Sequence, residues 1–308
     1  MEEVVGIVER HFGIALVRVK EDEWRSLSGC PQCGDGGKGH NSDRFRLLLN
    51  GPSNPRVWCR KCGYIAFVDA LDSARPLSEE DKMKLRMAAI ERRQEEQQRQ
   101  MDALQRMLTC QDHLLYHNNT MNGEGLEYWW EEGIQTAQVQ EYMLGYCHDC
   151  PTARGNASHT IPYLTGGKLY DIRHRLDVAD DRGRYRRHVA GLPHMLFHGD
   201  GLYANSDDIL ILEGEKKGIV VGAETGLNYV AVPGANGFVN SWAKRFDRFK
   251  GVYVAFDPDA TKAAADVARL FGHRGLVVSL PVKADEFFVR CGGTKKDFMG
   301  YLAQARGA

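Results

Sequence analysis

Continuous apolar runs that end in acidic residues dominate the last third of the chain. One run ends at Leu212 and is followed by Glu213-Gly214-Glu215, and another ends at Phe256 and is followed by Asp257-Pro258-Asp259. Uninterrupted runs of this kind are typical of strands buried on both faces, as in a parallel sheet. The pattern predicts four such strands, at Ile209–Leu212, Tyr229–Val232, Val252–Phe256 and Leu276–Leu280.

Amphipathic stretches separate these strands. They cover Lys216–Thr225, Ser241–Phe249 and Thr261–Phe271, and a last helix is expected over about Lys295–Ala305. Alternation of strand and helix predicts a parallel α/β sheet with right-handed crossovers. Sites in such sheets form at the carboxyl ends of the strands.

Acidic residues stand at these carboxyl ends. Glu213, Asp257 and Asp259 follow their strands directly, and Asp285, with Glu286 beside it, follows the fourth. Carboxylates gathered there without cationic partners would repel one another unless a divalent cation joined them. Because all the ligands offer oxygen, we expect Mg²⁺ or Mn²⁺ rather than zinc.

Near the other end of the chain, Cys30-Pro31-Gln32-Cys33 and Cys59-Arg60-Lys61-Cys62 form two CxxC pairs. A glycine follows each pair, Gly34 and Gly63, which suits the tight turns of a tetrahedral Cys₄ zinc ribbon. Residues 44–49 and 56–58 read as two strands of a hairpin between the pairs. The alternative is two incidental cysteine pairs, and the spacing favours zinc.

Basic and aromatic residues alternate between and after these cysteines. Such a pattern suits phosphate contacts and base stacking. It equally suits a solvated face beside aromatic core residues. The residues are Arg44, Phe45, Arg46, Arg56, Trp58, Arg60, Lys61 and Tyr64.

Helical patterns flank this module. Residues 1–20 carry apolar positions compatible with one short amphipathic helix. Ser78 with Asp81 is a helix N-terminal signal, and residues 91–100 contain no apolar residue. A helix that is polar all round bridges solvent between domains. We therefore expect a linker over which the zinc module moves relative to the rest.

Two shorter helices are expected further on, at Tyr128–Ile134 and Val139–Tyr146, joined at Gly133. Cys147-His148-Asp149-Cys150 is a third CxxC, but it has no second pair near it, and Cys110 and Cys291 are isolated. Ordinary loop cysteines are favoured here over a second metal or redox site.

A strand-rich, basic stretch precedes the parallel sheet. Ile161–Leu164, a Gly166-Gly167 turn and Lys168–Leu176 predict a hairpin. A basic strip beside a metal site suits a nucleotide polyphosphate or a nucleic-acid backbone. A solubilising loop, offset by Asp177, Asp180 and Asp181, is the alternative. The basic residues are Lys168, Arg173, Arg175, Arg182, Arg184, Arg186 and Arg187, with His174 and His188.

Bulk properties set limits on these interpretations. The 308 residues allow two or three domains, and a formal net charge of −1 means that nucleic-acid affinity must come from local patches. No apolar stretch approaches the roughly 18 residues of a membrane span, and the N-terminus does not open a signal peptide. We therefore expect a cytoplasmic protein with no membrane partner.

Taken in order, these features resemble bacterial DnaG-type primases and the primase half of T7-like phage primase–helicases. Glu213 matches the Glu of the first motif of the TOPRIM fold, and Asp257 and Asp259 match its Asp-x-Asp motif. Lys283, Asp285, Glu286 and Phe287 meet the later motif, and the segment from Tyr128 to Tyr146 resembles the one before the basic module.

The resemblance implies an α/β multidomain architecture. Its parts would be a zinc-binding β ribbon (1–74), a helical linker (75–109), an α+β basic subdomain of the polymerase core (110–205) and a TOPRIM parallel α/β domain (206–308). The chain departs from the family in three ways: Lys217 stands where an acidic residue is common, all four ribbon ligands are Cys, and the spacing between the pairs is long. No GxxxxGK[ST] motif is present, so a replicative helicase would be a separate chain.

The implied activity is primer synthesis on a single-stranded DNA template from ribonucleoside triphosphates. The resemblance assigns Glu213, Asp257, Asp259 and Asp285 to two or more Mg²⁺ or Mn²⁺ ions, with Glu213 as a metal ligand or proton-transfer group. One structural zinc would bind Cys30, Cys33, Cys59 and Cys62. Triphosphate and template contacts would come from Lys168, Arg173, Arg184, Arg186 and Arg187, with Lys216 and Lys217.

Two other readings stay open at this stage. A TOPRIM nuclease would use the same metals to activate water, and a recombination-mediator-like DNA clamp also joins a Cys₄ zinc site to TOPRIM. A type IA topoisomerase would need a large further domain for its tyrosine, and too little chain remains. The template sequence, primer length, choice between ribo- and deoxynucleotides, helicase partner, source replicon and oligomeric state do not follow from the sequence.

Overall fold

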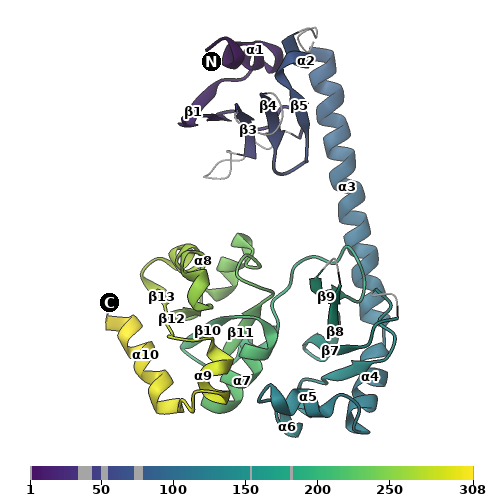
Figure 1. The fold of residues 1–308 in the computed structure, drawn as a ribbon, viewed down its shortest axis with the longest axis vertical. Helices are drawn as coiled ribbons and strands as arrows, with labels where there is room; N and C mark the ends of the chain where they lie inside the picture. The colour runs from purple at the N-terminus through teal and green to yellow at the C-terminus, as the bar shows by residue number, and fades with distance from the viewer. Residues whose placement is uncertain are drawn as a thin grey trace. The chain divides into compact units, whose positions relative to one another are not determined.

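The computed structural model describes residues 2–33, 44–49, 55–72, 79–152, 155–180 and 183–307. It forms two compact units, residues 1–99 and 100–308 (Figure 1). The first unit contains one β-sheet and the second contains two, and each unit has its own hydrophobic core. Gly34, Ser78 and Arg182, to which the sequence analysis assigned roles, lie outside the described residues, as does Asp181.

The first unit contains a five-stranded antiparallel sheet in the order β1-β2-β3-β4-β5. Helix α1 (Glu2–Phe12) precedes the sheet and the short helix α2 (Val68–Asp72) follows it. The strands are β1 (Leu16–Lys20), β2 (Glu23–Ser26), β3 (Phe45–Leu48), β4 (Arg56–Cys59) and β5 (Ile65–Phe67).

The hairpin predicted between the CxxC pairs is confirmed as β3 and β4, with Phe45 opposite Cys59. The single helix expected over residues 1–20 is shorter than predicted and ends at Phe12. Beyond it, Val17 and Val19 alternate with Arg18 and Lys20, and this two-residue period suits a strand paired to β2.

The core of this unit lies between α1 and the sheet. Phe45, Leu47 and Val57 are fully buried, and Phe12 from α1 packs edge-on against Phe45 with ring centroids 5.4 Å apart. Alternate residues of β3 therefore point into the core, as the period of a strand requires. This core carries the cysteine-bearing turns on a rigid base.

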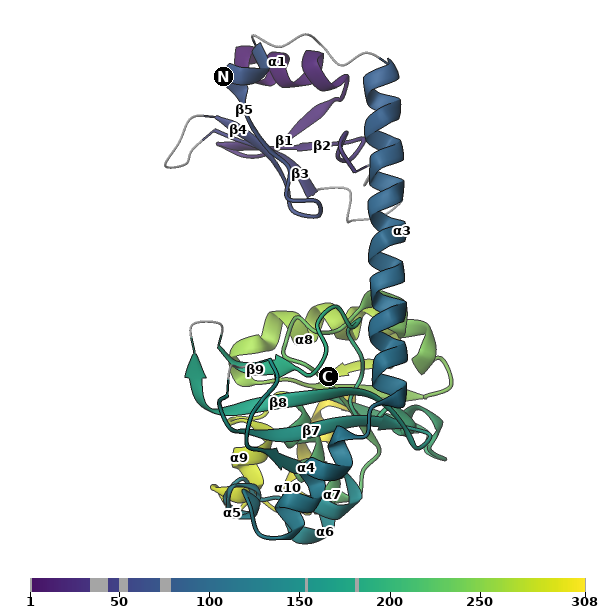
Figure 2. The same cartoon turned by 90° about the vertical axis from the view of Figure 1, so that its right-hand side faces the viewer.

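Helix α3 (Glu79–Thr109) is 31 residues long, which confirms the long helix predicted from the polar pattern (Figure 2). Residues 91–99 are all exposed, whereas Ala103 and Met107 are fully buried in the second unit. The boundary between the two units falls within this helix, at Arg99. Neither α3 nor another helix within the described ranges is both long and apolar enough to cross a membrane.

The second unit begins with α4 (Asp112–Met121), α5 (Leu126–Glu131) and α6 (Thr136–Glu141), which precede a four-stranded antiparallel sheet. The predicted hairpin at Gly166-Gly167 is confirmed, and φ is +57° and +70° at these glycines, as a two-residue hairpin turn requires. The sheet order is β6 (Gly145–Cys147), β7 (Ser158–Thr165), β8 (Lys168–Asp180) and β9 (Gly183–Arg187).

The second of the two short helices predicted here differs from the prediction. It ends at Glu141, and the chain turns at Met143, where φ is +52°, before entering β6 at Gly145. A side chain at Gly145 would meet the backbone of Tyr116 at 2.6 Å. The structure of residues 142–147 is therefore determined by the close packing of β6 on α4 rather than by the helical pattern of the local sequence.

The predicted parallel sheet is confirmed in the order β11-β10-β12-β13, with every pair parallel. Its strands are β10 (Asp208–Glu213), β11 (Tyr229–Val232), β12 (Gly251–Ala255) and β13 (Gly275–Val277). The helices packed with it are α7 (Glu215–Thr225), α8 (Thr261–Ala268), α9 (Ala284–Val289) and α10 (Lys295–Gly307).

Both faces of this sheet are covered, which explains the continuous apolar runs. Leu210 and Leu212 pack on the side of α7, α9 and α10, whereas Ile209 and Ile211 pack on the side of α8 (Figure 1). The first of these two cores also contains Trp129 and other residues of the antiparallel part, so the two sheets of this unit share one interior.

Two predicted elements are only partly formed. The helix expected over Ser241–Phe249 is a 3₁₀ helix at Asn240–Phe246, and the fourth strand ends at Val277 rather than Leu280. Other 3₁₀ segments cover Gly199–Tyr203, Pro258–Ala260 and Arg269–Arg274. Pro281 follows directly after Leu280 and has no N–H with which to extend a ladder.

Replacing Gly218 with alanine should destabilise the second unit. A Cβ there would lie 2.5 Å from the Tyr229 ring, because α7 approaches β11 closely. We expect a loss of about 1–3 kcal/mol in unfolding free energy. Gly300→Ala on the exposed side of α10, where a Cβ meets nothing within 4 Å, is the matched control. It should gain about 0.5–1 kcal/mol, and urea unfolding of both variants would check this.

Candidate active site and zinc centre

Glu213 and Asp257 stand side by side at the carboxyl edge of the parallel sheet. Glu213 ends β10 and Asp257 comes two residues after β12, and these neighbouring strands pair in parallel with Leu212 opposite Ala255. The backbone N–H of Asp257 donates a hydrogen bond to Oε2 of Glu213 at 3.3 Å. The parallel register therefore brings these two predicted carboxylates together.

Lys217 provides a cationic partner at this edge, which the sequence analysis did not foresee. Its Nζ lies 2.9 Å from Oδ1 and 3.0 Å from Oδ2 of Asp257, and both side chains are largely buried. Burial alone would lower the pKa of Lys217, but the hydrogen bond to Asp257 and the charges of Asp257, Asp285 and Glu213 outweigh it and raise the pKa. The ammonium is thus held protonated among three carboxylates.

The other two predicted carboxylates lie on neighbouring turns. Asp285 is in the first turn of α9, where its Oδ1 accepts a hydrogen bond from the N–H of Glu286 at 3.1 Å. Asp259 is exposed on the short 3₁₀ segment after Asp257. Among the described residues, the carboxylates of this edge do not place three ligand atoms within 4.8 Å of one another.

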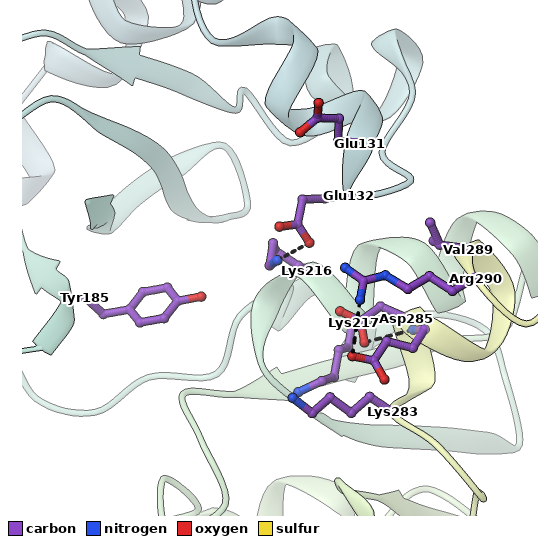
Figure 3. A pocket seen from close by; sticks show the side chains of 10 residues that line it. Glu131, Glu132, Tyr185, Lys216, Lys217, Lys283, Asp285, Val289 and Arg290 are labelled. Atoms are coloured by element: carbon purple, nitrogen blue, oxygen red, sulfur yellow. Dashed lines mark hydrogen bonds and ion pairs between the residues drawn. The ribbon is translucent and has the colours of Figure 1, made fainter. Parts of the chain in front are cut away.

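A cavity of about 270 Å³ opens beside these residues (Figure 3). Lys216, Lys217, Lys283 and Asp285 line it from the parallel-sheet side, and Tyr185 of β9 lines it from the antiparallel side. The other lining residues are Glu131, Glu132, Glu286, Val289 and Arg290. The cavity therefore offers three ammonium groups next to the carboxylate edge.

Glu132 at the end of α5 is a site residue that the sequence analysis missed. Its carboxylate accepts a hydrogen bond from Lys216 (Figure 3). Arg175 lies 3.9 Å from the other carboxylate oxygen. Burial raises the pKa of Glu132, but Lys216 outweighs it and the pKa lies below its ordinary value. No sequence signal marks this pair, because its members are 84 residues apart.

Two of the predicted phosphate-binding arginines pair with a buried carboxylate instead of projecting into solvent. Nε of Arg187 lies 3.3 Å and Nε of Arg173 lies 3.8 Å from Oδ2 of Asp171, which is fully buried. Arg187 also donates to the carbonyls of Leu192 and Pro193. These arginines therefore hold β8, β9 and the following loop together.

The remaining predicted basic residues differ in exposure. Lys168 and Arg184 are exposed at the two ends of the hairpin region. Arg186 is 9% exposed and donates to the carbonyl of Tyr185. Exposed side chains are better placed than buried ones for contact with a flexible strand, so Lys168 and Arg184 stay the clearest candidates for template contacts.

Asp171 makes the stability of this unit depend on pH. Burial raises its pKa to about 6, and Arg187 and Arg173 only partly oppose this. The folded state therefore holds the proton more tightly than the unfolded chain. The associated stability is fully present below the ordinary value of 3.8 and is lost as pH rises through about 6.

We expect the unfolding free energy of the wild type, measured against Asp171→Asn, to fall by about 2 kcal/mol between pH 3.8 and 6. Urea unfolding of both proteins across this range would check it. A difference that rises with pH would mean that the arginines, rather than burial, set the pKa of Asp171.

The four predicted zinc ligands do come together in the first unit. The Sγ atoms of Cys30 and Cys62 are 3.9 Å apart, those of Cys33 and Cys59 are 3.8 Å apart, and all four lie within 4.8 Å of one another. Tetrahedral zinc with Zn–S bonds of about 2.3 Å places its sulfur atoms about 3.8 Å apart. The donor set fits one structural zinc, and no disulfide joins these cysteines.

Basic side chains from α3 lie beside this zinc centre within the first unit. A cavity is lined by Arg92, Arg93 and Glu96 of α3 together with Lys61, Cys33 and Cys62. Arg93 donates to the carbonyl of Cys33 at 2.8 Å. Part of the segment that the sequence analysis treated as linker therefore belongs to the surroundings of the zinc centre. Arg46, in contrast, pairs with Glu23.

No protein-family model and no curated protein sequence matches the chain. Solved primase structures share its fold. The zinc-binding and RNA polymerase domains of the Aquifex aeolicus primase align with a TM-score of 0.52 and 19% identity, covering 99% of this chain and 85% of that one.

A DnaG primase catalytic domain bound to single-stranded DNA aligns with a TM-score of 0.51 and 15% identity, covering 68% of this chain and 82% of that one. The RNA polymerase domain of the Mycobacterium tuberculosis primase DnaG gives 0.51 and 13%, covering 63% and 80%. The mixed α/β architecture with a Cys₄ site is therefore that of primase zinc-binding and RNA polymerase domains. At these identities the likeness is one of fold.

Proposed function

We propose that this chain is a DNA primase that synthesises short RNA primers on single-stranded DNA by metal-dependent nucleotidyl transfer. The supporting observation is the cavity in which Lys216, Lys217 and Lys283 adjoin the carboxylates at the sheet edge, in a chain with the fold of primase domains. Acidic groups that can bind cations next to amines that can bind phosphates suit triphosphate chemistry.

The carboxylates fit hard divalent cations. Glu213, Asp257, Asp259 and Asp285 offer oxygen ligands alone, the set that Mg²⁺ and Mn²⁺ prefer. When bound, two such ions would lower the pKa of the attacking 3′-hydroxyl and neutralise charge that develops on the α-phosphate. In this TOPRIM-like domain, the donors come from the end of β10, the 3₁₀ turn after β12 and the first turn of α9.

The lysines of the cavity would bind and orient the triphosphate. Lys216 and Lys217 leave the first turn of α7, and Lys283 directly precedes α9. Lys217 would exchange its contact with Asp257 for a phosphate oxygen as a cation arrives. Glu213, whose Oε2 accepts a hydrogen bond from the backbone N–H of Asp257, is the candidate proton acceptor.

The zinc unit would hold the template. Arg92, Arg93 and Lys61 lie beside the cysteines, and a nucleic-acid backbone is the ligand that such a basic group prefers. Residues 1–74 would act as the template-binding domain, 75–109 as linker, 110–205 as basic subdomain and 206–308 as catalytic domain.

The first experiment is incubation of the full chain with mixed single-stranded templates, Mg²⁺ or Mn²⁺ and labelled ribonucleotides, with products resolved by length. Short oligoribonucleotides would support a primase. Metal-dependent shortening of the template without new products would indicate a nuclease. Binding of the template without either reaction would indicate a DNA clamp and would overturn the proposal.

Lys217 should compete with the metal for Asp257. We expect Lys217→Gln to tighten Mn²⁺ binding at least about 10-fold, because a charge-assisted hydrogen bond worth about 1.5–3 kcal/mol no longer has to break. Mn²⁺ titration followed by electron paramagnetic resonance, without nucleotide, would measure this. Lys216→Gln is the matched control, since Lys216 pairs with Glu132. Equal affinities in the two variants would contradict the competition.

A further inference from the structure

A second group of metal-ligand side chains lies in the second unit and shares no residue with the sheet-edge carboxylates or the ribbon cysteines. Cys110 follows α3, Asp112 begins α4, and His188 follows β9. Ligand atoms of these three residues lie within 4.8 Å of one another. Cys110 stands isolated in the sequence, because Asp112 and His188 lie on separate elements.

The distances within this group suit a tetrahedral cation. Nε2 of His188 lies 3.7 Å from Sγ of Cys110 and 3.1 Å from Oδ2 of Asp112. Around zinc, with bonds of about 2.3 Å to sulfur and about 2.0 Å to nitrogen and oxygen, the same pairs would be about 3.6 Å and about 3.3 Å apart. Two of the three distances thus already match such a site, and the third is no longer than 4.8 Å.

Buried groups orient the histidine as metal sites require. Nδ1 of His188 is 3.1 Å from Nε2 of His174, and Nδ1 of His174 is 2.9 Å from Oγ of Ser158. His174 and Ser158 are fully buried, and the two imidazole rings are stacked. In such a relay, Nδ1–H of His188 donates to His174 and Nδ1–H of His174 donates to Ser158. Nε2 of His188 then carries a lone pair, which faces Cys110 and Asp112.

We propose that Cys110, Asp112 and His188 bind a second divalent cation of the zinc class. One thiolate, one imidazole and one carboxylate are ligands that zinc accepts, and a water or a fourth external ligand would complete the tetrahedron. Asp112 is 53% exposed, so the site is open to solvent on that side. The cation would fasten the junction of α3 and α4 to the end of β9.

The test is metal content of the full chain after saturation with Zn²⁺ and removal of excess by gel filtration. The wild type should retain two zinc ions per chain, whereas Cys110→Ser should retain one. Asp112 is exposed, so Asp112→Asn should remove a metal ligand without unfolding the chain. It should bind the second zinc at least about 100-fold more weakly.

Two controls assign the ions. Cys59→Ser should lose the ribbon zinc and keep the second, and Cys291→Ser, which changes an exposed cysteine outside both groups, should keep both. When Co²⁺ replaces zinc, the four thiolates of the ribbon should give a strong cobalt–thiolate absorption. The second site, which has one thiolate, should add a weaker one. One zinc per chain in the wild type, or two in Cys110→Ser, would overturn the proposal.

Discussion

Asp257→Ala is expected to abolish dinucleotide synthesis while the chain keeps its fold. Asp257 is the most buried of the four proposed carboxylates and contacts both Glu213 and Lys217. Removing one charged group aimed at developing charge typically costs catalysis about 100- to 1,000-fold, and a metal ligand should cost at least as much. The measurement is the initial rate of dinucleotide formation on a single-stranded template.

The controls separate chemistry from folding. Asp266→Ala removes an exposed carboxylate of α8 that pairs with Arg269, and it should keep full activity. Asp257→Asn keeps the size of the side chain and should be as inactive as the alanine variant. Circular dichroism would establish that all three variants are folded. Synthesis by Asp257→Ala at more than a tenth of the wild-type rate would remove Asp257 from the site.

Cys59→Ser should unfold the first unit and leave the second intact. Cys59 is fully buried at the end of β4, and its core partners there are few because the sheet is small. Structural zinc contributes about 10–16 kcal/mol to the folding of zinc-finger peptides, far more than such a core supplies. Hydrogen exchange should show loss of amide protection in strands β1 to β5 and retention in strands β6 to β13.

The same variant should lose template-directed synthesis on long single strands if the zinc unit holds the template. Cys291→Ser, at an exposed position of the second unit, is again the matched control. Retained protection of β3 and β4 in Cys59→Ser without zinc would show that the small core suffices, and would contradict the dependence on metal.

Much of the parallel sheet followed from the sequence, because burial on both faces leaves a simple pattern. The runs at Ile209 and Val252 identified β10 and β12, and parallel pairing then placed Glu213 beside Asp257. The four zinc ligands were predicted for a similar reason, since their spacing alone carries the signal. A local sequence pattern was enough to predict the structure in these two cases. In each, a single physical constraint, burial on both faces of a sheet or coordination of one zinc ion, determines both the residues and their arrangement.

Contacts between distant segments did not follow from the sequence. Lys216 pairs with Glu132, and Arg187 pairs with Asp171, although nothing in either local pattern indicates a partner. The prediction of phosphate-binding arginines assumed that every basic side chain is available to a ligand. Arg173 and Arg187 instead pair with Asp171 inside the sheet, because a buried carboxylate without a cationic partner costs free energy. The helix expected at Val139–Tyr146 failed because packing of Gly145 on α4 outweighed helical periodicity.

The position of β9 at the end of its sheet has a further consequence, for solubility. An edge strand presents unpaired N–H and C=O groups to which a strand of another molecule can add. In β9, the edge strand of this sheet, Arg184 and Arg186 flank Tyr185. Charges on an edge strand discourage such addition, so the exposed Arg184 should protect the protein from aggregation. A neutralised β9 should therefore aggregate at concentrations at which the wild type stays dispersed.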